Sequence, residues 1–262
     1  MVGKHSKAKK NKPLLGNHQK CWIWGRNAVM ETLSAGFWQI WELHLSERLS
    51  ADEIRAAEER AQQLSIPVFI TTDKELNQKC RASDHQGMIA KMAPFPYSSA
   101  AELIQRKTEN PLFLILDRIQ DPYNFGAIIR SAEVLGADGI FVGTDEQCEV
   151  TSLVCRTSAG AVNRIPIAEL SDLVQLCRDL KQAEISLVGT AMQAPDILPE
   201  TNFQQPTAII VGNEGFGISQ VLLNECTHLV RIPQQGKTES LNVAVSAGIL
   251  LYEASRQRNF IQ

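Results

Sequence analysis

Three short stretches of this chain combine glycines with polar side chains that could carry chemistry. The first contains Asn124 and Arg130, the second contains Glu214, and the third contains Ser240 and Asn242. An arginine guanidinium is planar and always charged, so it can grip a phosphate with two N–H donors at once. Glycine lets a backbone approach a ligand closely or adopt a positive φ. Each stretch also has a simpler structural explanation, which must be weighed beside the functional one.

In the first stretch, Pro122 and Asn124 mark a turn, and a helix is expected at residues 125–135. One interpretation of the helix is that Arg130 and Glu133 form a surface ion pair worth about 0.5 kcal/mol. The other is that Asn124 and Arg130 face the ends of strands, where the arginine can hold a phosphate. The first stretch alone leaves both interpretations open.

The second stretch places Gly212, Gly215 and Gly217 directly after a buried strand expected at residues 208–212. The order G-x-x-G-x-G differs from the dinucleotide fingerprint G-x-G-x-x-G, so a nicotinamide-dependent oxidoreductase is disfavoured. The P-loop pattern is absent too. A tight turn, with Glu214 stabilising a helix dipole, is the simpler alternative to a ligand site.

The third stretch reads as a strand at residues 229–232, a turn, and a helix that begins near residue 240. Ser240 is the expected N-cap, because its hydroxyl can accept a hydrogen bond from an unpaired backbone N–H. Gly248 lies inside this helix, where glycine costs about 1 kcal/mol relative to alanine. Close approach of a ligand or another backbone would explain it, and so would a tightly packed core helix.

Composition excludes several classes of protein. The 44% hydrophobic and 21% charged residues are ordinary for a globular protein. No apolar run approaches the ~20 residues of a membrane span, and no signal peptide is evident, so we expect a cytoplasmic protein without membrane contact. The six cysteines show no C-x-x-C spacing and no histidine partner at zinc spacing, which favours reduced thiols and no bound metal.

Charge is distributed unevenly along the chain. Residues 1–20 contain six lysines and no acid, so the net charge of −3 leaves −9 on the remainder. We expect residues 1–20 to be a flexible basic arm, which either contacts a polyanion or only aids solubility.

Strand and helix patterns alternate through the rest of the chain. In residues 21–93 they predict a small α/β unit, with strands at 40–45, 66–70 and 85–91 and helices near 28–35, 51–64 and 72–80. This unit has no phosphate loop and no acid–base set, so we interpret it as a binding module. The prolines and serines that follow indicate a linker, placed at residues 94–109.

Residues 110–262 carry continuous apolar runs, which are typical of strands buried on both faces of a parallel sheet. The runs lie at 112–116, 139–143, 164–168, 185–189, 208–212 and 229–232, and the helical patterns at 125–135, 152–158, 172–181, 219–225 and 241–256. This alternation predicts a doubly covered parallel sheet, in which ligands bind beyond the carboxyl ends of the strands.

Together the three stretches resemble the motifs of the SpoU (TrmH-like) family of RNA 2′-O-ribose methyltransferases. An Asn and a Gly followed by a helical Arg match the first motif, strand-G-x-E-G-x-G matches the second, and I-P-(x)-x-G-x-x-x-S-L-N matches the third. The matching residues are Asn124, Gly126 and Arg130; Gly212, Glu214, Gly215 and Gly217; and Ile232, Pro233, Gly236, Ser240, Leu241 and Asn242. The order and spacing agree across residues 111–258. The first unit is similar to the family's ribosomal-protein-like substrate-binding domain.

The resemblance implies an α/β fold of the SPOUT type, with a deep trefoil knot at residues 211–252 of the methyltransferase domain. It also implies a homodimer that uses S-adenosyl-L-methionine to methylate RNA. The N-terminal module favours a guanosine of large-subunit ribosomal RNA, because the tRNA guanosine enzymes of the family typically lack it. Methylation of tRNA, or a catalytically silent role in ribosome assembly, remains an alternative.

Site residues also follow from the resemblance. The expected cofactor-binding residues are Thr190, Gly212, Glu214, Gly217, Ile232 and Leu241, and the expected catalytic residues are Arg130, Asn124, Glu214, Ser240 and Asn242. Because arginine stays protonated in proteins, we expect Arg130 to stabilise charge on the ribose hydroxyl and to hold a phosphate. Asn124 would position the ribose, and Glu214 would fix Arg130 or its own loop. Ser240 and Asn242 would order the third motif around the methionine end of the cofactor.

Overall fold

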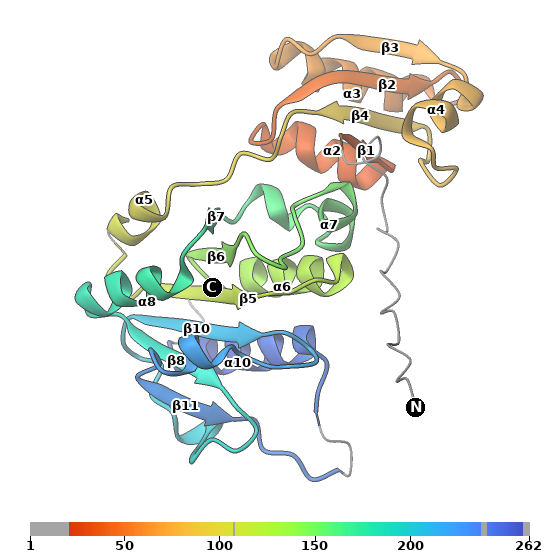
Figure 1. Ribbon diagram of the computed structural model, residues 1–262. Helices are drawn as coiled ribbons and strands as arrows, with labels where there is room; N and C mark the ends of the chain where they lie inside the picture. Colours follow the sequence, from red (N-terminus) through yellow and green to blue (C-terminus); the bar gives the residue numbers. More distant parts are fainter. Residues whose placement is uncertain (1–20, 107, 237–239, 259–262) are drawn as a thin grey trace, which may run out of the picture.

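Two α/β units build the protein, and the chain passes from the smaller to the larger through one connecting segment (Figure 1). The computed structural model describes residues 21–106, 108–236 and 240–258. The basic arm expected at residues 1–20 lies outside the described residues, so its role stays a prediction.

The smaller unit is a four-stranded sheet in the order β1-β4-β2-β3, in which only β2 and β3 are parallel. Its elements are β1 (Trp22–Trp24), α2 (Arg26–Ala35), β2 (Ile40–Ser46), α3 (Ala51–Gln63), β3 (Val68–Thr71), α4 (Asp73–Cys80) and β4 (Met88–Met92). The sequence predicted three of the strands and missed β1. All three residues of β1 are buried, and a run of three is shorter than the roughly four to eight apolar residues that indicate a buried strand.

Two helices of this unit begin at capping boxes. Ser50 accepts from the N–H of Glu53, and the Glu53 carboxylate accepts from the N–H of Ser50. Thr72 and Glu75 make the same reciprocal pair before α4. Each box satisfies two backbone donors that a helix end leaves unpaired, which explains why the predicted starts of α3 and α4 agree with the structure.

The connecting segment contains α5 (Ala100–Gln105), and the larger unit follows. Its elements are β5 (Leu112–Asp117), α6 (Pro122–Val134), β6 (Gly139–Gly143), α7 (Ser152–Thr157), η1 (Ala161–Asn163), β7 (Ile167–Leu170), α8 (Leu173–Gln182), β8 (Ser186–Thr190), β9 (Asp196–Ile197), η2 (Leu198–Glu200), β10 (Thr207–Gly212), α9 (Gln220–Leu223), β11 (His228–Arg231) and α10 (Val243–Gln257). All six predicted strands are present. Strand β9, with two residues, was not predicted.

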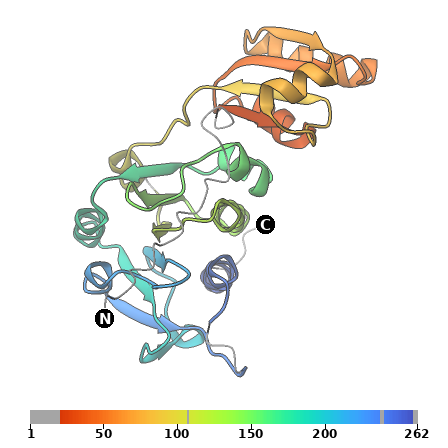
Figure 2. The same ribbon diagram turned by 45° about the vertical axis from the view of Figure 1, so that its right-hand side comes forward.

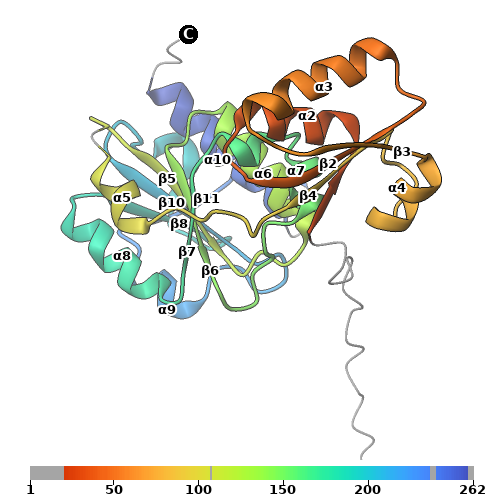
Figure 3. The same cartoon turned by 90° about the horizontal axis from the view of Figure 1, so that it is seen from above.

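The seven strands of the larger unit form one parallel sheet in the order β7-β6-β5-β10-β8-β11-β9. Side chains alternate across a strand, so β5 serves two cores. Leu112, Leu114 and Leu116 belong to the apolar cluster of α6 and α10, whereas Phe113 and Ile115 belong to that of α8 and α9. Helices α6, α7 and α10 cover one side and α5, α8 and α9 the other (Figure 3). The predicted doubly covered parallel sheet is confirmed.

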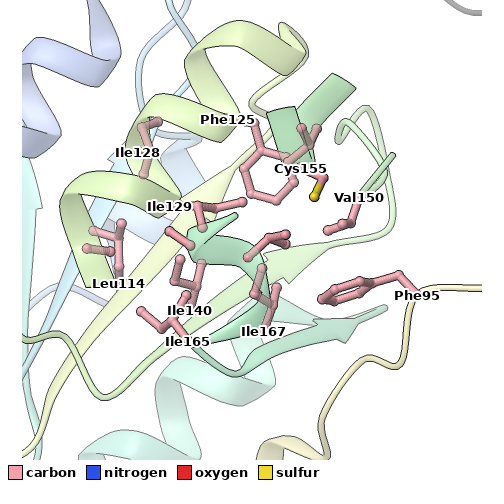
Figure 4. Close-up of a cluster of buried hydrophobic side chains, with 14 of the residues drawn as sticks. Phe95, Leu114, Phe125, Ile128, Ile129, Ile140, Val150, Cys155, Ile165 and Ile167 are labelled. Atoms are coloured by element: carbon pink, nitrogen blue, oxygen red, sulfur yellow. The ribbon is translucent and has the colours of Figure 1, made fainter. Parts of the chain in front are cut away.

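The helix of the first motif is held by its apolar face. Phe125, Ile128 and Ile129 of α6 are fully buried and point toward the strand residues Leu114 and Ile140 (Figure 4). Burial of each such side chain contributes about 1.5–3 kcal/mol. The opposite face of α6 is exposed and carries Arg130 together with Tyr123 and Val134.

The smaller unit contacts the larger through α7 and η1 (Figure 2). Arg156 donates to Asp84 at 2.6 Å and lies 5.1 Å from the Trp24 ring centre, and the Trp24 indole N–H donates to the same carboxylate. Burial raises the pKa of Asp84, but the bonds from Arg156 and Trp24 and the guanidinium charge lower it more, so the net pKa is lowered. One apolar cluster runs through both units.

Within residues 21–106, 108–236 and 240–258, no helix is long and apolar enough to cross a membrane. The same residues contain no group of three or more His, Cys, Asp or Glu side chains arranged to hold a metal ion. Cys155, Cys177 and Cys226 are free thiols. Burial raises the pKa of Cys155 to about 11, which leaves this thiol protonated at neutral pH.

Candidate active site

The carboxyl ends of adjacent strands bring three predicted cofactor residues to one edge of the large sheet. Gly212 ends β10, Thr190 ends the neighbouring β8, and Ile232 directly follows β11, which pairs with the other side of β8. Parallel strands end at the same edge, and ligands of open α/β sheets bind there. The strand order therefore places at one edge residues that lie in three separate parts of the sequence.

Gly212 has no room for a side chain, because the loop that follows folds back over it. A Cβ built on Gly212 would lie 2.2 Å from the carbonyl carbon of Gly217 and 2.2 Å from the backbone nitrogen of Ile218. Both are backbone atoms, so no side-chain rotation could relieve the contact. The need for glycine at this strand end comes from the close approach of the loop.

Asn213 and Gly217 close residues 213–217, here named the 213–217 loop, into a small hairpin. Their backbone N–H groups donate to each other's carbonyls at 3.1 and 2.8 Å, and Gly217 has a φ of +69° that favours glycine. The Asn213 side chain accepts from the N–H groups of Gly215 and Phe216. Sequence reasoning missed Asn213, although Asn in a glycine-rich turn is a known turn signal.

Asn124, Glu214 and Asn242 form a chain of hydrogen bonds that joins all three motif stretches. Asn124 Nδ2 donates to Glu214 Oε1 at 2.7 Å, and Asn242 Nδ2 donates to Asn124 Oδ1 at 3.0 Å. The bonded pairs lie 90 and 118 residues apart in sequence, so only the fold assembles them. Asn124 keeps a second N–H and a second lone pair, because each amide group carries two of each. It can therefore hold the loops and still contact a ligand.

Asn242 also begins the last helix. Its Oδ1 accepts from the N–H groups of Ala244 and Val245, which makes it the N-cap of α10. The prediction that Ser240 is the N-cap was wrong by two residues. The backbone of Asn242 is non-helical, as at an N-cap. Its side-chain oxygen accepts from the first turn of α10, while its side-chain nitrogen donates to Asn124.

Arg130 is exposed on α6 and makes no hydrogen bond or ion pair with any residue that the structure describes. The surface pair with Glu133, one of the two interpretations of the sequence, does not form. Six residues separate Asn124 from Arg130, so the two side chains point roughly 120° apart around the helix axis. Glu214 accordingly bonds to Asn124, and Arg130 stands apart from the hydrogen-bonded chain.

The remaining residues of the third motif lie in the connection from β11 to α10. Ile232 is half-buried, whereas Pro233, Gly236 and Ser240 are exposed. Leu241, although apolar, is 39% exposed. Residues 237–239 lie outside the described part of the chain.

Gly126 of the first motif acts through helix packing. A Cβ there would lie 1.9 Å from the Thr157 hydroxyl oxygen and 2.9 Å from the Ser158 backbone nitrogen, so glycine lets α6 lie against α7. Gly248 differs, because its nearest neighbour would be the Ser131 hydroxyl at 3.8 Å, an ordinary contact. Close approach within this chain therefore does not explain Gly248.

A further residue that the sequence did not single out is Asp117, which ends β5 beside Gly212. Its carboxylate is buried and accepts from the backbone N–H of Ser219 at 2.6 Å. Asp117, Arg118 and Ser219 also line a cavity of about 280 Å³ that extends to Asp145 and Asp172. In the sequence, the signal that could have identified Asp117 was an aspartate directly after the apolar run at residues 112–116.

Comparison with known proteins agrees with this geometry. Residues 111–252 match the SpoU rRNA Methylase family, and residues 22–98 match the domain described as RNA 2′-O ribose methyltransferase substrate binding. The chain belongs to the SpoU rRNA methylase family. This family consists of RNA 2′-O-ribose methyltransferases, as the resemblance of the three motifs implied.

Individual relatives of the SpoU family cover most of the chain. The 23S rRNA (guanosine-2′-O-)-methyltransferase RlmB of Shewanella oneidensis is 33% identical over 238 residues, which are 90% of this chain and 97% of that protein. The crystal structure of the SpoU methyltransferase AviRb from Streptomyces viridochromogenes with AdoMet superposes with a TM-score of 0.77 at 26% identity, covering 90% of each chain. The TrmH/SpoU tRNA modifying enzyme of A. aeolicus, with a TM-score of 0.53 and 26% identity, covers 62% of this chain and 81% of its own.

Proposed function

We propose that this SpoU-family protein transfers the methyl group of S-adenosyl-L-methionine to the ribose 2′-hydroxyl of a guanosine in large-subunit ribosomal RNA. The hydrogen-bonded chain Glu214–Asn124–Asn242 carries the proposal, because it joins the three family motifs at the sheet edge where ligands bind. The ribosomal RNA substrate is supported by the relative that acts on 23S rRNA, which matches both units. The tRNA-modifying relative covers only 62% of this chain.

The residues at this edge suit S-adenosyl-L-methionine. Gly212 leaves the end of β10 without a side chain, and the third motif contributes two apolar side chains, Ile232 directly after β11 and the partly exposed Leu241. Apolar walls with a few backbone hydrogen-bonding groups are typical of sites for flat rings such as adenine. When bound, the cofactor supplies a methyl group on a positively charged sulfur. Thr190, Glu214 and Gly217 complete the proposed contacts.

Arg130 and Asn124 act on the RNA in this proposal. The exposed guanidinium of Arg130 stays protonated and stabilises negative charge as the 2′-hydroxyl becomes a nucleophile. Asn124 uses its remaining N–H and lone pair to orient the ribose, while Glu214 and Asn242 hold its amide in place. Ser240 contributes to the order of the third motif. The proton leaves to solvent or to a neighbouring group.

A homodimer belongs to the same proposal. Helices α6 and α10 lie side by side on one face of the sheet (Figure 3), and Val134, Val245 and Tyr252 on them are 68%, 50% and 52% exposed. Large exposed apolar side chains mark interaction surfaces. A twofold partner on this face would bring a second protomer next to Arg130. Sedimentation should then give twice the 29.0 kDa mass of one chain.

We assign residues 21–93 to the RNA substrate-binding domain, 94–109 to the linker and 110–262 to the methyltransferase domain. The deep trefoil knot is placed at residues 211–252. A cytoplasmic location follows from a ribosomal RNA substrate.

Mapping of 2′-O-methyl groups in total RNA from cells with and without the gene tests the function. Loss of one methylated guanosine in large-subunit ribosomal RNA is the expected result. Loss of a tRNA site instead would replace the proposed substrate. If no site is lost, and calorimetry detects no binding of S-adenosyl-L-methionine, the protein is a non-catalytic assembly factor and the proposal fails.

Arg130→Lys tests whether Arg130 acts by donating two parallel hydrogen bonds. Lysine keeps the charge but cannot donate two parallel hydrogen bonds, so methyl transfer to RNA should fall by about tenfold or more. Binding of S-adenosyl-L-methionine should not change, because Arg130 makes no hydrogen bond or ion pair with any described residue of the loops at the cofactor edge. Wild-type turnover by the lysine variant would show that the positive charge alone suffices and that the paired N–H donors of arginine are not required.

A further inference from the structure

The Asp117 carboxylate holds Ser219, which lies at the C-terminal end of the segment that follows Gly212. The carboxylate is only 4% exposed, and its Oδ2 accepts from the backbone N–H of Ser219 at 2.6 Å. Its Oδ1 accepts from Arg118 Nε at 3.0 Å, and Arg118 Nη2 reaches Oδ2 at 3.3 Å. A buried carboxylate needs such charge-assisted bonds to offset its lost hydration. Asp117 is therefore a fixed anchor for Ser219, two residues after the 213–217 loop.

Arg118 makes hydrogen bonds to both ends of the 213–217 loop. Its Nη2 donates to the Gly217 carbonyl at 3.4 Å, and its own carbonyl accepts from Asn213 Nδ2 at 3.0 Å. Arg118 has a φ of +60°, which is uncommon for a residue other than glycine. This backbone conformation accompanies a residue whose carbonyl and side chain both bond to the loop. Asp117 and Arg118 thus hold the 213–217 loop at Asn213 and Gly217, and the chain just after it at Ser219.

We propose that Asp117 and Arg118 are positioning residues that hold the 213–217 loop in the shape that binds the cofactor and presents Glu214 to Asn124. The proposal rests on the function proposed above. Neither residue belongs to the three motifs. Asp117 holds a backbone N–H, and Arg118 holds the Gly217 carbonyl and the Asn213 side chain. A weakened anchor should let the loop move away from Gly212, so affinity for S-adenosyl-L-methionine should fall before the fold is lost.

Asp117→Asn is the main test, and Asp145→Asn is its matched control. Asp145 is an exposed carboxylate on the rim of the same 280 Å³ cavity, and it makes no side-chain hydrogen bond to any described residue. A hydrogen bond to a charged group corresponds to about tenfold or more in an equilibrium constant. Calorimetry should show a Kd for S-adenosyl-L-methionine raised about tenfold in Asp117→Asn. The Asp145→Asn variant should bind like the wild type.

Hydrogen exchange in the protein without cofactor gives a readout that needs no activity. Amides of residues 213–219 should exchange faster in Asp117→Asn, whereas amides of residues 208–210 inside β10 stay protected. Arg118→Gln should reproduce the effect, and the double variant should add little to either single change, because the two residues act as one unit. Arg118→Gln also serves if Asp117→Asn does not fold.

Turnover separates positioning from catalysis. In Asp117→Asn the KM for S-adenosyl-L-methionine should rise, and kcat at saturating cofactor should stay near wild type. Unchanged exchange at residues 213–219, or a fall in kcat with an unchanged Kd, overturns the proposal. A uniform loss of protection across β10 shows a purely structural role and overturns it as well. If the wild type binds no S-adenosyl-L-methionine, the proposed function fails, and hydrogen exchange still decides whether the anchor exists.

Discussion

Gly212→Ala should disrupt the site through one added methyl group. The Cβ would lie 2.2 Å from two backbone atoms of the returning loop, whereas ordinary contacts begin at 3.4 Å. The loop must therefore move by more than 1 Å. Asn213–Gly217 bonds of 3.1 and 2.8 Å, or the 2.7 Å bond from Asn124 to Glu214, would then exceed hydrogen-bonding distance.

The expected magnitude follows from these bonds. Loss of two net hydrogen bonds costs about 2 kcal/mol. Replacing glycine by alanine also reduces the conformational entropy of the unfolded chain, which raises the free energy of unfolding by about 0.4–1 kcal/mol. We therefore expect the free energy of unfolding to fall by about 1–2 kcal/mol, and the Kd for S-adenosyl-L-methionine to rise by about tenfold or more.

Gly143→Ala is the matched control, because Gly143 ends the parallel strand β6 in the same sheet. Its added Cβ would meet only the Leu173 side chain, at 3.4 Å. Urea denaturation should show Gly143→Ala at or slightly above wild-type stability, and calorimetry should show unchanged cofactor binding. If Gly212→Ala binds the cofactor as tightly as Gly143→Ala does, the close approach of the loop is not what the site requires.

Two further predictions concern Asn242 and Asp84. Asn242→Ala removes the N-cap of α10 and should lower the free energy of unfolding by about 1 kcal/mol. Asn242→Asp keeps the cap and loses only the donor to Asn124. Equal melting temperatures for the two variants would contradict the capping role. The pKa of Asp84 is lowered in the folded protein, so its stabilisation is complete above the ordinary value of 3.8 and is lost as the pH falls below it. The difference in free energy of unfolding between wild type and Asp84→Asn, at most about 1 kcal/mol for so exposed a pair, should shrink below about pH 4, and a difference that does not change with pH would refute the assignment.

Local signals in the sequence were enough to predict most elements. The apolar runs of β5, β6 and β10 and the helical pattern of α6 depend on residues close in sequence, so their periods predicted a parallel sheet with helices on both faces. Strand β1 was missed because its three residues are fewer than the roughly four to eight that an apolar run needs to indicate a strand. The N-cap of α10 was misplaced because Ser240 and Asn242 are both good caps, and the choice depends on a bond to α6.

The sequence by itself determined which residue types stand at the three motifs, and the motif order identified the family. Only the tertiary structure decided that Asn124 lies between Glu214 and Asn242, that Arg130 stands apart from them, and that Asp117 anchors the loop beside Gly212. The physical reason is separation along the chain: these bonds join residues 90 to 118 positions apart, where no local period or propensity acts. The order of the strands in the sheet brings them together, and that order follows from packing of the whole domain.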